Sequence, residues 1–157
     1  RQTRVGENRK LFGMFKFRTM FVDAATEGPP EPQARIDPQL PHKRKDDPRV
    51  TRLGKLPRRY SLDELPQLLN VLRGEMSLVG PRPEMPWLVD QYQSWQRQRF
   101  AVPQGMTGWW QINGRSDKTM HLRTEDDLYD VYNYSIWLDL WILIRTPFSV
   151  ISGQGAF

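Results

Sequence analysis

Hydrophobic and polar side chains alternate near the start of the chain. Between residues 11 and 22, apolar or aromatic groups change places with polar ones, and this period of two is typical of a β-strand. Lys16 and Arg18 fall on the same face of that predicted strand. The segment that follows, residues 23–48, has proline at positions 29, 30, 32, 38, 41 and 48 among charged and small residues. We therefore expect residues 23–48 to form a long, mobile loop.

Leucine recurs at helical spacing after this loop. It occupies positions 65, 68, 69 and 72, which predicts a helix from about Ser61 to Leu72 that Gly74 ends. Residues 83–100, rich in Gln and Arg, also predict a helix, which Pro103 follows. The apolar members of this second helix are Trp87, Leu88, Tyr92, Trp95 and Phe100.

The C-terminal part predicts two more helices. They cover about residues 124–134 and residues 135–145, and Pro147 bends or ends the second. Strand signals are few, and no internal repeat is visible. The expected fold class is therefore α+β and mainly helical. Residues 1–157 would form one compact catalytic domain with a small β element, amphipathic helices and long loops rich in proline and glycine.

Composition and charge narrow the function classes. The 157 residues carry 23 basic and 18 acidic side chains, and the formal charge of +5 favours nucleotide phosphates, anionic lipid surfaces or nucleic acid as partners. The absence of cysteine excludes disulfides and thiol nucleophiles and fits a reducing compartment. His42 and His121 lack metal-ligand spacing, so zinc chemistry is not expected. The longest strongly apolar stretch, residues 136–144, is far shorter than the roughly 20 residues of a membrane-spanning helix.

Two adjacent carboxylates, Asp63 and Glu64, follow two arginines, Arg58 and Arg59, at the expected start of a helix. Two interpretations are open. In the structural one, Ser61 and Glu64 form a capping box that satisfies free backbone N–H groups. In the chemical one, an ionised Asp63 is the nucleophile of a phosphoryl transfer, Glu64 helps to hold a magnesium ion, and the arginines neutralise phosphate oxygens.

Prolines restrict the backbone at both charged motifs. Pro66 conflicts with a regular helix at this point, so we expect a kink or a later start capped by Asp63. Pro81 and Pro83 flank Arg82 and restrict the direction in which its guanidinium leaves the chain, which suits two-pronged binding of phosphate. A surface arginine in a turn is the alternative interpretation.

Six segments stand in a fixed order along nearly the whole chain. They are Lys16-Phe17-Arg18-Thr19-Met20, Asp47 to Gly54, Ser61 to Leu68, Gly80-Pro81-Arg82-Pro83, Gly105 to Arg115, and Trp137-Leu138-Asp139-Leu140. Together they resemble the bacterial sugar transferases. These are the monotopic phosphoglycosyl transferases, which include the undecaprenyl-phosphate glucose- and galactose-phosphate transferases.

This resemblance implies a two-step transfer. Asp63 would attack the phosphorus next to the sugar of a nucleotide sugar, expected to be a UDP sugar, and would expel nucleoside monophosphate. A polyprenyl phosphate, expected to be undecaprenyl phosphate, would then accept the phosphosugar. Asp63 and Glu64 would bind Mg²⁺, while Arg58 and Arg82 would bind substrate phosphate. The product would initiate a bacterial surface glycan, such as an exopolysaccharide, a capsule or an O-antigen.

Three further basic residues lie in segments that carry the resemblance. Lys16 and Arg18 are expected to hold the phosphate of the nucleotide or of the lipid, although the strand pattern equally allows ordinary solvated positions. Arg115 is expected to touch the sugar or the nucleotide, whereas Asn113-Gly114 before it indicates only a turn.

The family also implies a place on the cytoplasmic face of the bacterial inner membrane, and a homodimer. Its members carry an apolar re-entrant helix just upstream of the part that matches residues 1–6, and we expect this chain to lack it. Trp109 and Trp110 are predicted to face the membrane from a loop. One helix either lies in the bilayer interface or packs as an amphipathic core helix, and it carries Trp137, Leu140, Trp141 and Ile144 beside Arg145.

A non-catalytic module is the competing function. The net charge and six tryptophans would suit a domain that binds membranes or nucleic acid without chemistry. However, the basic residues are dispersed among acidic ones, and the sequence contains no motif typical of nucleic-acid binding. We therefore expect a membrane surface as a partner and no nucleic acid.

Overall fold

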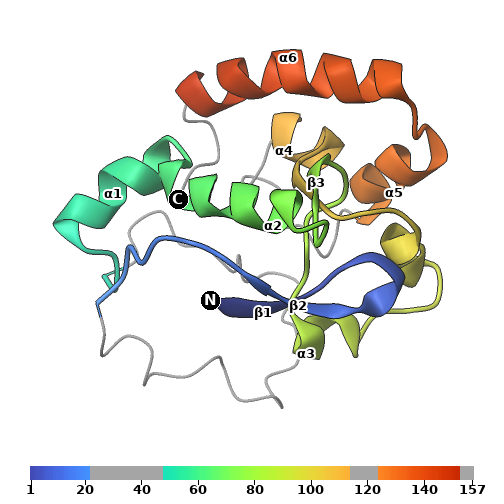
Figure 1. The fold of residues 1–157 in the computed structure, drawn as a ribbon, viewed down its shortest axis with the longest axis horizontal. Helices are drawn as coiled ribbons and strands as arrows, with labels where there is room; N and C mark the ends of the chain where they lie inside the picture. The colour runs from blue at the N-terminus through green and yellow to red at the C-terminus, as the bar shows by residue number, and fades with distance from the viewer. Residues whose placement is uncertain (22–47, 114–123, 153–157) are drawn as a thin grey trace.

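The computed structural model describes residues 1–21, 48–113 and 124–152 (Figure 1). Most of the loop expected at 23–48 therefore lies outside the described residues, as does Arg115. The described part is mainly helical with two small sheets, so the predicted fold class is confirmed. In Figure 1, α6 crosses the top of the molecule, α1 and α2 form a row beneath it, and the hairpin of β1 and β2 lies below that row.

Four strands form two separate pairs. Strands β1 (Gln2–Val5) and β2 (Leu11–Met14) make an antiparallel hairpin through a short 3₁₀ turn at Glu7–Arg9. Strands β3 (Ser77–Val79) and β4 (Gly105–Thr107) pair in parallel.

The helical elements are short except at the C-terminus. They are α1 (Arg52–Arg59), the 3₁₀ helix η3 (Leu62–Gln67), α2 (Leu68–Leu72), α3 (Pro86–Val89), the 3₁₀ helix η4 (Gln96–Ala101), α4 (Trp109–Ile112), α5 (Thr124–Tyr132) and α6 (Ile136–Ser152). No helix in the described ranges is long and apolar enough to cross a membrane.

The strand predicted over residues 11–22 is shorter than its alternating pattern suggests, because β2 ends at Met14. After Met14 the chain leaves the hairpin and pairs with η3 and α2 instead. The backbone N–H of Phe17 donates to the carbonyl of Asp63 at 2.9 Å, and the N–H of Phe15 donates to the Asn70 side chain at 2.9 Å. The alternation thus marks an extended segment, but its partners are helical residues that period-two spacing cannot reveal.

The helix predicted over residues 61–72 is divided into η3 and α2. Ser61 adopts the left-handed conformation, with φ of 53°, and a 3₁₀ helix rather than an α-helix accommodates Pro66. The expected end is confirmed, since Gly74 has φ of 71° and donates its N–H to the carbonyl of Val71. The preceding helix α1, which contains Pro57, was not predicted.

The single helix predicted over residues 83–100 is wrong. The chain instead forms α3, turns, and forms η4. In a straight helix, residues 84 and 99 would lie roughly 22 Å apart. In the structure a guanidinium nitrogen of Arg99 lies 3.7 Å from a carboxylate oxygen of Glu84, so the chain must fold back between them. This pairing of buried charges, rather than the local apolar pattern, decides the path.

Of the two C-terminal helices, α5 matches its prediction closely. Helix α6 extends beyond the predicted end, because Pro147 lies inside it and does not end it. Ile142 is the buried residue of α6, and it faces the rest of the domain near α4. The remaining apolar residues of α6 are largely exposed, so the alternative of a core helix is wrong.

Candidate active site

Asp63 and Glu64 occupy the first turn of η3. Asp63 is 2% exposed, while Glu64 is half-buried. The capping box is not formed, because the Ser61 side chain makes no capping hydrogen bond to the helix. The Glu64 carboxylate instead turns towards cationic side chains from two other segments of the chain.

Lys16 lies against both carboxylates. Its ammonium nitrogen is 2.8 Å from Oδ2 of Asp63 and 3.3 Å from Oε1 of Glu64. The ammonium therefore stands as a cation between the two acids, and such a partner favours the ionised form of a carboxylate. The predicted link of Lys16 to the phosphate-handling site is supported, whereas Arg18, two residues on, is exposed.

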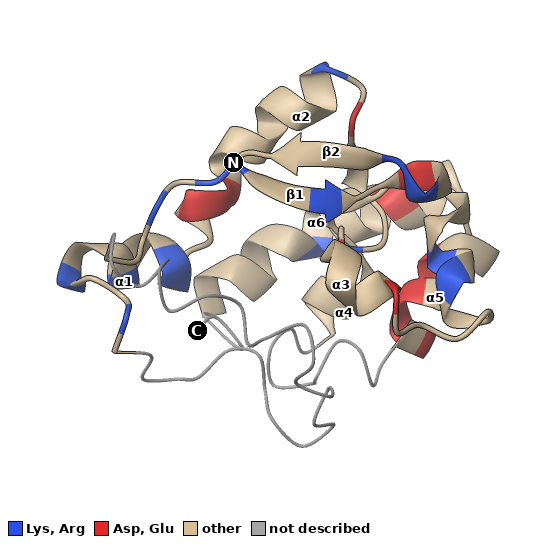
Figure 2. Cartoon of the chain, turned by 90° about the horizontal axis from the view of Figure 1, so that it is seen from below, with Lys and Arg blue, Asp and Glu red and all other residues tan. Residues whose placement is uncertain are grey.

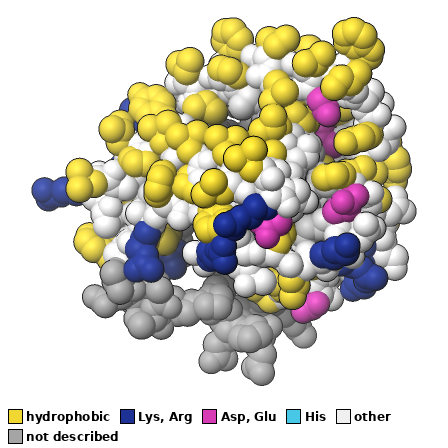
Figure 3. Space-filling view, viewed as in Figure 1, with side chains coloured by type: hydrophobic (Ala, Val, Ile, Leu, Met, Phe, Trp, Pro, Cys, Tyr) yellow, Lys and Arg dark blue, Asp and Glu magenta, His cyan; other side chains and the backbone are white. Residues whose placement is uncertain are grey.

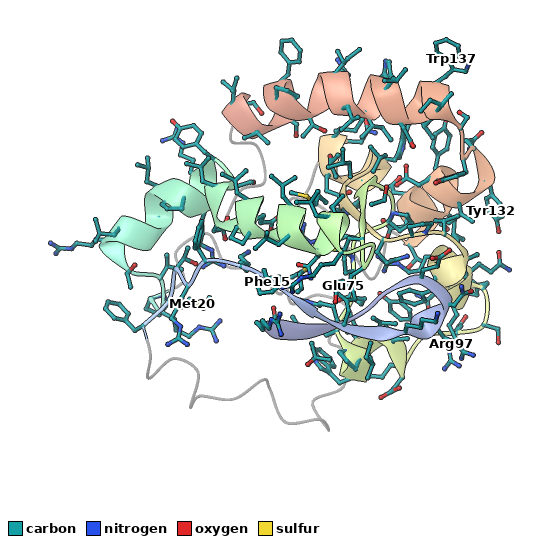
Figure 4. The ribbon with its side chains drawn as sticks, viewed as in Figure 1. Phe15, Met20, Glu75, Arg97, Tyr132 and Trp137 are labelled. Carbon is teal, nitrogen blue, oxygen red and sulfur yellow. The ribbon has the colours of Figure 1, made fainter. Side chains whose placement is uncertain are left out.

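Asn70 holds the segment that carries Lys16. The fully buried Asn70 side chain accepts the N–H of Phe15, and it donates to the carbonyl of Gly13 at 3.0 Å and to the Glu75 carboxylate at 2.6 Å. Phe15 and Glu75 both lie beneath α2 in Figure 4. A buried side chain that satisfies three partners fixes their relative positions strongly.

Pro66 provides the second tie to this segment. In a 3₁₀ helix the residue at position 66 would donate its N–H to the carbonyl of Asp63, but proline has no N–H. The Asp63 carbonyl accepts the N–H of Phe17 instead. The residues on either side of Lys16 are thus bonded to α2 and to η3, so its ammonium is held at the carboxylates.

Arg82 forms a two-pronged pair with Glu64. Nη1 of Arg82 donates to Oε2 of Glu64 at 3.1 Å, and Nη2 donates to Oε1 at 2.5 Å. The attraction of Glu64 raises the pKa of the Arg82 guanidinium above its usual value. This planar geometry is the one that an arginine also offers to a phosphate group.

The loop before Arg82 leaves the end of the parallel pair β3–β4. A side chain at Gly80, where φ is 153°, would place Cβ 2.3 Å from the carbonyl oxygen of Pro103. The N–H of Gly80 bonds to the carbonyl of Thr107, and the N–H of Gly105 bonds to that of Pro81, both at 2.9 Å. Arg82 therefore starts from a firmly placed backbone and is not a loose turn arginine.

Arg58 lies in the last turn of α1, next to η3. Its Nη1 is buried and has no hydrogen-bond partner. A buried guanidinium nitrogen without a partner is costly, and a bound anion would relieve that cost. Figure 2 shows the basic end of α1 beside the acidic segment that follows it along the chain.

A buried network that the sequence did not reveal lies behind Arg82. It consists of Glu84, Tyr92, Arg99 and Asp127. Burial raises the pKa of Asp127 to about 6, against the opposing attraction of Arg99. The only sequence signal was the position of Asp127 beside Leu128 on the buried face of α5.

The two neighbouring tryptophans do not behave as predicted. Trp110 is 7% exposed, so its predicted contact with the membrane is wrong. Trp109 is half-buried because its ring stacks on Tyr129, with centroids 4.0 Å apart, and on Trp141 at 5.5 Å. These residues begin α4 and attach it to α5 and α6.

Asp130 at the start of α4 makes stability depend on pH. Its buried carboxylate accepts the N–H of Trp109 at 3.0 Å, and burial raises its pKa to about 7. The folded state thus binds this proton more tightly than the unfolded chain, whose Asp pKa is about 3.9. The contribution of Asp130 to the free energy of unfolding therefore falls as the pH rises from about 4 to 7.

We expect Asp130→Asn to gain thermal stability relative to wild type as the pH rises. The amide oxygen still accepts the Trp109 N–H, while the cost of the buried charge disappears. The difference in Tm should increase by a few degrees between about pH 4 and pH 8, measured by circular dichroism. Asp90→Asn, at an exposed position, controls for the lost charge. A Tm difference that is constant with pH would contradict this role of Asp130.

Comparison with known proteins agrees with the site. The bacterial sugar transferase family matches residues 1–153, and the chain belongs to this family. The chain is 42% identical to the UDP-galactose-lipid carrier transferase of Erwinia amylovora, over 98% of this chain and 33% of that protein. It is 40% identical to the undecaprenyl-phosphate galactose phosphotransferase of Salmonella typhimurium, over 98% and 33%. It is 41% identical to the uncharacterized sugar transferase EpsL of Bacillus subtilis, over 99% and 70%. The chain thus spans about a third of the length of the first two relatives.

Proposed function

We propose that this domain transfers a sugar 1-phosphate from a UDP sugar to a polyprenyl phosphate, through a phosphosugar ester on Asp63. The observation that carries the proposal is a buried carboxylate, Asp63, held 2.8 Å from a lysine and next to a glutamate that an arginine grips from two sides. Two relatives are named as transferases that use a lipid carrier or undecaprenyl phosphate, which supports the same acceptor here.

The first step forms the ester. A carboxylate oxygen of Asp63 attacks the phosphorus attached to the sugar, and the bond from this phosphorus to the bridging oxygen breaks. The electron pair leaves with nucleoside monophosphate. In the second step an oxygen of polyprenyl phosphate attacks the same phosphorus, the aspartyl ester bond breaks, and the carboxylate returns. Each step exchanges one phosphorus–oxygen bond for another.

The cationic side chains provide the charge stabilisation that such a transfer needs. Lys16 keeps Asp63 ionised before the reaction and is close enough to neutralise an incoming phosphate oxygen. Arg58 offers its buried, unpartnered Nη1, and Arg82 offers its planar fork. We assign the substrate phosphates to these three residues, and Arg18 to the exposed rim of the site.

Magnesium fits the two carboxylates. The Lys16 ammonium between Asp63 and Glu64 shows that a cation is stable at this place. Among the residues that the structure describes, no group of three or more His, Cys, Asp or Glu side chains could hold a metal ion. We therefore propose that Asp63 and Glu64 hold Mg²⁺ together with substrate phosphates, a common arrangement for this ion. When bound, Mg²⁺ would neutralise charge on the phosphates.

The apolar outer face supports a place at a membrane. Figure 3 shows hydrophobic side chains spread over the face that α6 and α2 share. Trp137 is 78% exposed, and many other large apolar residues join it: Leu68, Leu69, Leu72, Ile136, Leu140, Trp141, Ile144, Phe148 and Ile151. An exposed patch of this kind is typical of interfaces. We propose that it rests on the cytoplasmic side of the bacterial inner membrane, where the products would begin a surface glycan.

A release assay tests the proposal. The full-length protein is mixed with Mg²⁺, a panel of UDP sugars and phospholipid vesicles that carry undecaprenyl phosphate. We expect UMP release with at least one sugar, loss of release with EDTA, and sedimentation of the protein with the vesicles. Absence of UMP release with every sugar would overturn the proposed function. Salt-dependent binding of DNA or RNA would then support the non-catalytic alternative.

A further inference from the structure

The main chain of Arg82 is gripped from both sides by one buried ion pair. Nη2 of Arg99 donates to the carbonyl oxygen of Arg82 at 2.7 Å and lies 2.9 Å from Oδ2 of Asp127. The Asp127 carboxylate in turn accepts the backbone N–H of Arg82. Both charged side chains are 0% exposed. The N–H and the C=O of a single residue are thus bonded to two partners that also bond to each other.

The Arg99 guanidinium is itself anchored at its other nitrogen. Nη1 donates to the hydroxyl of Tyr92 at 2.9 Å, and that hydroxyl donates to Oε2 of Glu84 at 3.3 Å. Arg4 of β1 approaches the same Glu84 carboxylate at 3.8 Å. The ion pair therefore connects β1, the α3–η4 region and α5, all at the main chain of Arg82.

Stability alone is a weak reason for this arrangement. Removing two charges from water costs several kcal/mol per ion, and replacing a buried ion pair by well-packed apolar residues is often neutral or stabilising. What an apolar pair cannot do is accept one main-chain N–H and donate to the neighbouring C=O. The distinctive effect of Arg99 and Asp127 is on the orientation of the peptide groups on either side of Arg82.

We propose that Arg99 and Asp127 are positioning residues that aim the Arg82 guanidinium at Glu64 and at the substrate phosphate. This inference rests on the proposed function for its catalytic consequence. Pro81 already restricts the backbone before Arg82, and its carbonyl is bonded to Gly105. With both peptide groups of Arg82 also fixed, only its side-chain torsions remain. A misplacement of the fork by about 1 Å is enough to cost roughly 100-fold in rate.

The test is a double variant, Arg99→Met with Asp127→Leu, which removes both charges and leaves neither buried alone. We expect it to fold, with a kcat for UMP release at least about 10-fold below wild type and a KM for the UDP sugar changed by less than about 3-fold, since positioning acts in the transition state. In an Arg82→Ala background the same double change should lower kcat no further. Arg97→Met, at an exposed position of η4, is the matched control (Figure 4).

A folded double variant with near-wild-type kcat would overturn the proposal, as would an equal further loss in the Arg82→Ala background. If the double variant does not fold, Arg99→Lys replaces it, because lysine keeps the charge but cannot hold Tyr92, Asp127 and the carbonyl of Arg82 in one plane.

A second readout is independent of turnover. The Nε–H resonance of Arg82, assigned by its loss in Arg82→Ala, should shift in the double variant and stay in place in Arg97→Met. An unchanged resonance contradicts the positioning role even if the wild type releases no UMP. Failure of the proposed function is thereby distinguished from failure of this inference.

Discussion

Asp63→Asn should reduce UMP release to background, a loss of at least about 1,000-fold. The amide has nearly the same size and shape as the carboxylate but is not a nucleophile, so no ester can form. In the absence of polyprenyl phosphate, wild-type protein incubated with the UDP sugar should gain the mass of one phosphosugar, detected by intact-protein mass spectrometry. The Asn variant should gain none.

The structure offers a matched control for this change. Asp90→Asn removes one carboxylate from an exposed position and should keep both the release of UMP and the mass gain. Because Lys16 loses its nearest ion-pair partner in Asp63→Asn, the Tm of the variant should be recorded alongside. A folded Asn variant that releases UMP at the wild-type rate would show that Asp63 is not the nucleophile.

Arg82→Lys should lose roughly 10- to 100-fold in kcat although the positive charge is kept. The Arg82 guanidinium reaches both oxygens of Glu64 at once, whereas an ammonium is a point charge that cannot reproduce the fork. Steady-state UMP release over a range of UDP-sugar concentrations separates kcat from KM. Arg97→Lys, at an exposed site on η4, is expected to leave both constants unchanged. Near-normal turnover by Arg82→Lys would remove Arg82 from the phosphate site.

Local patterns predicted the parts of the fold that local forces decide. The helical spacing of residues 124–134 and the stop at Gly74 depend on neighbours in the sequence, and both are confirmed. The division of residues 83–100 depends on a contact between Glu84 and Arg99 across a turn, which no periodicity encodes. The 3₁₀ form of η3 was signalled only as a conflict at Pro66, because the left-handed conformation of Ser61 has no clear mark in the sequence.

The candidate site was predicted in its charged residues but not in its supports. Asp63, Glu64, Lys16 and Arg82 do converge, as the motifs indicated. Asn70, by contrast, sits among leucines as one more helical residue, and its role depends on Gly13 and Phe15, more than 50 positions earlier. Supporting residues of this kind have ordinary local environments, so that only the folded chain identifies them.

The main chain at Asp63 has a use separate from its side chain. In a regular helix every carbonyl is committed to a later N–H, but the missing N–H of Pro66 leaves the Asp63 carbonyl free to hold the segment of Lys16. One residue therefore contributes the reacting group through its side chain and the architecture of the site through its backbone. Any side chain can be exchanged there without cutting the architectural bond. Chemistry and construction are thus separable at this position, and evolution could silence the enzyme while leaving its site built.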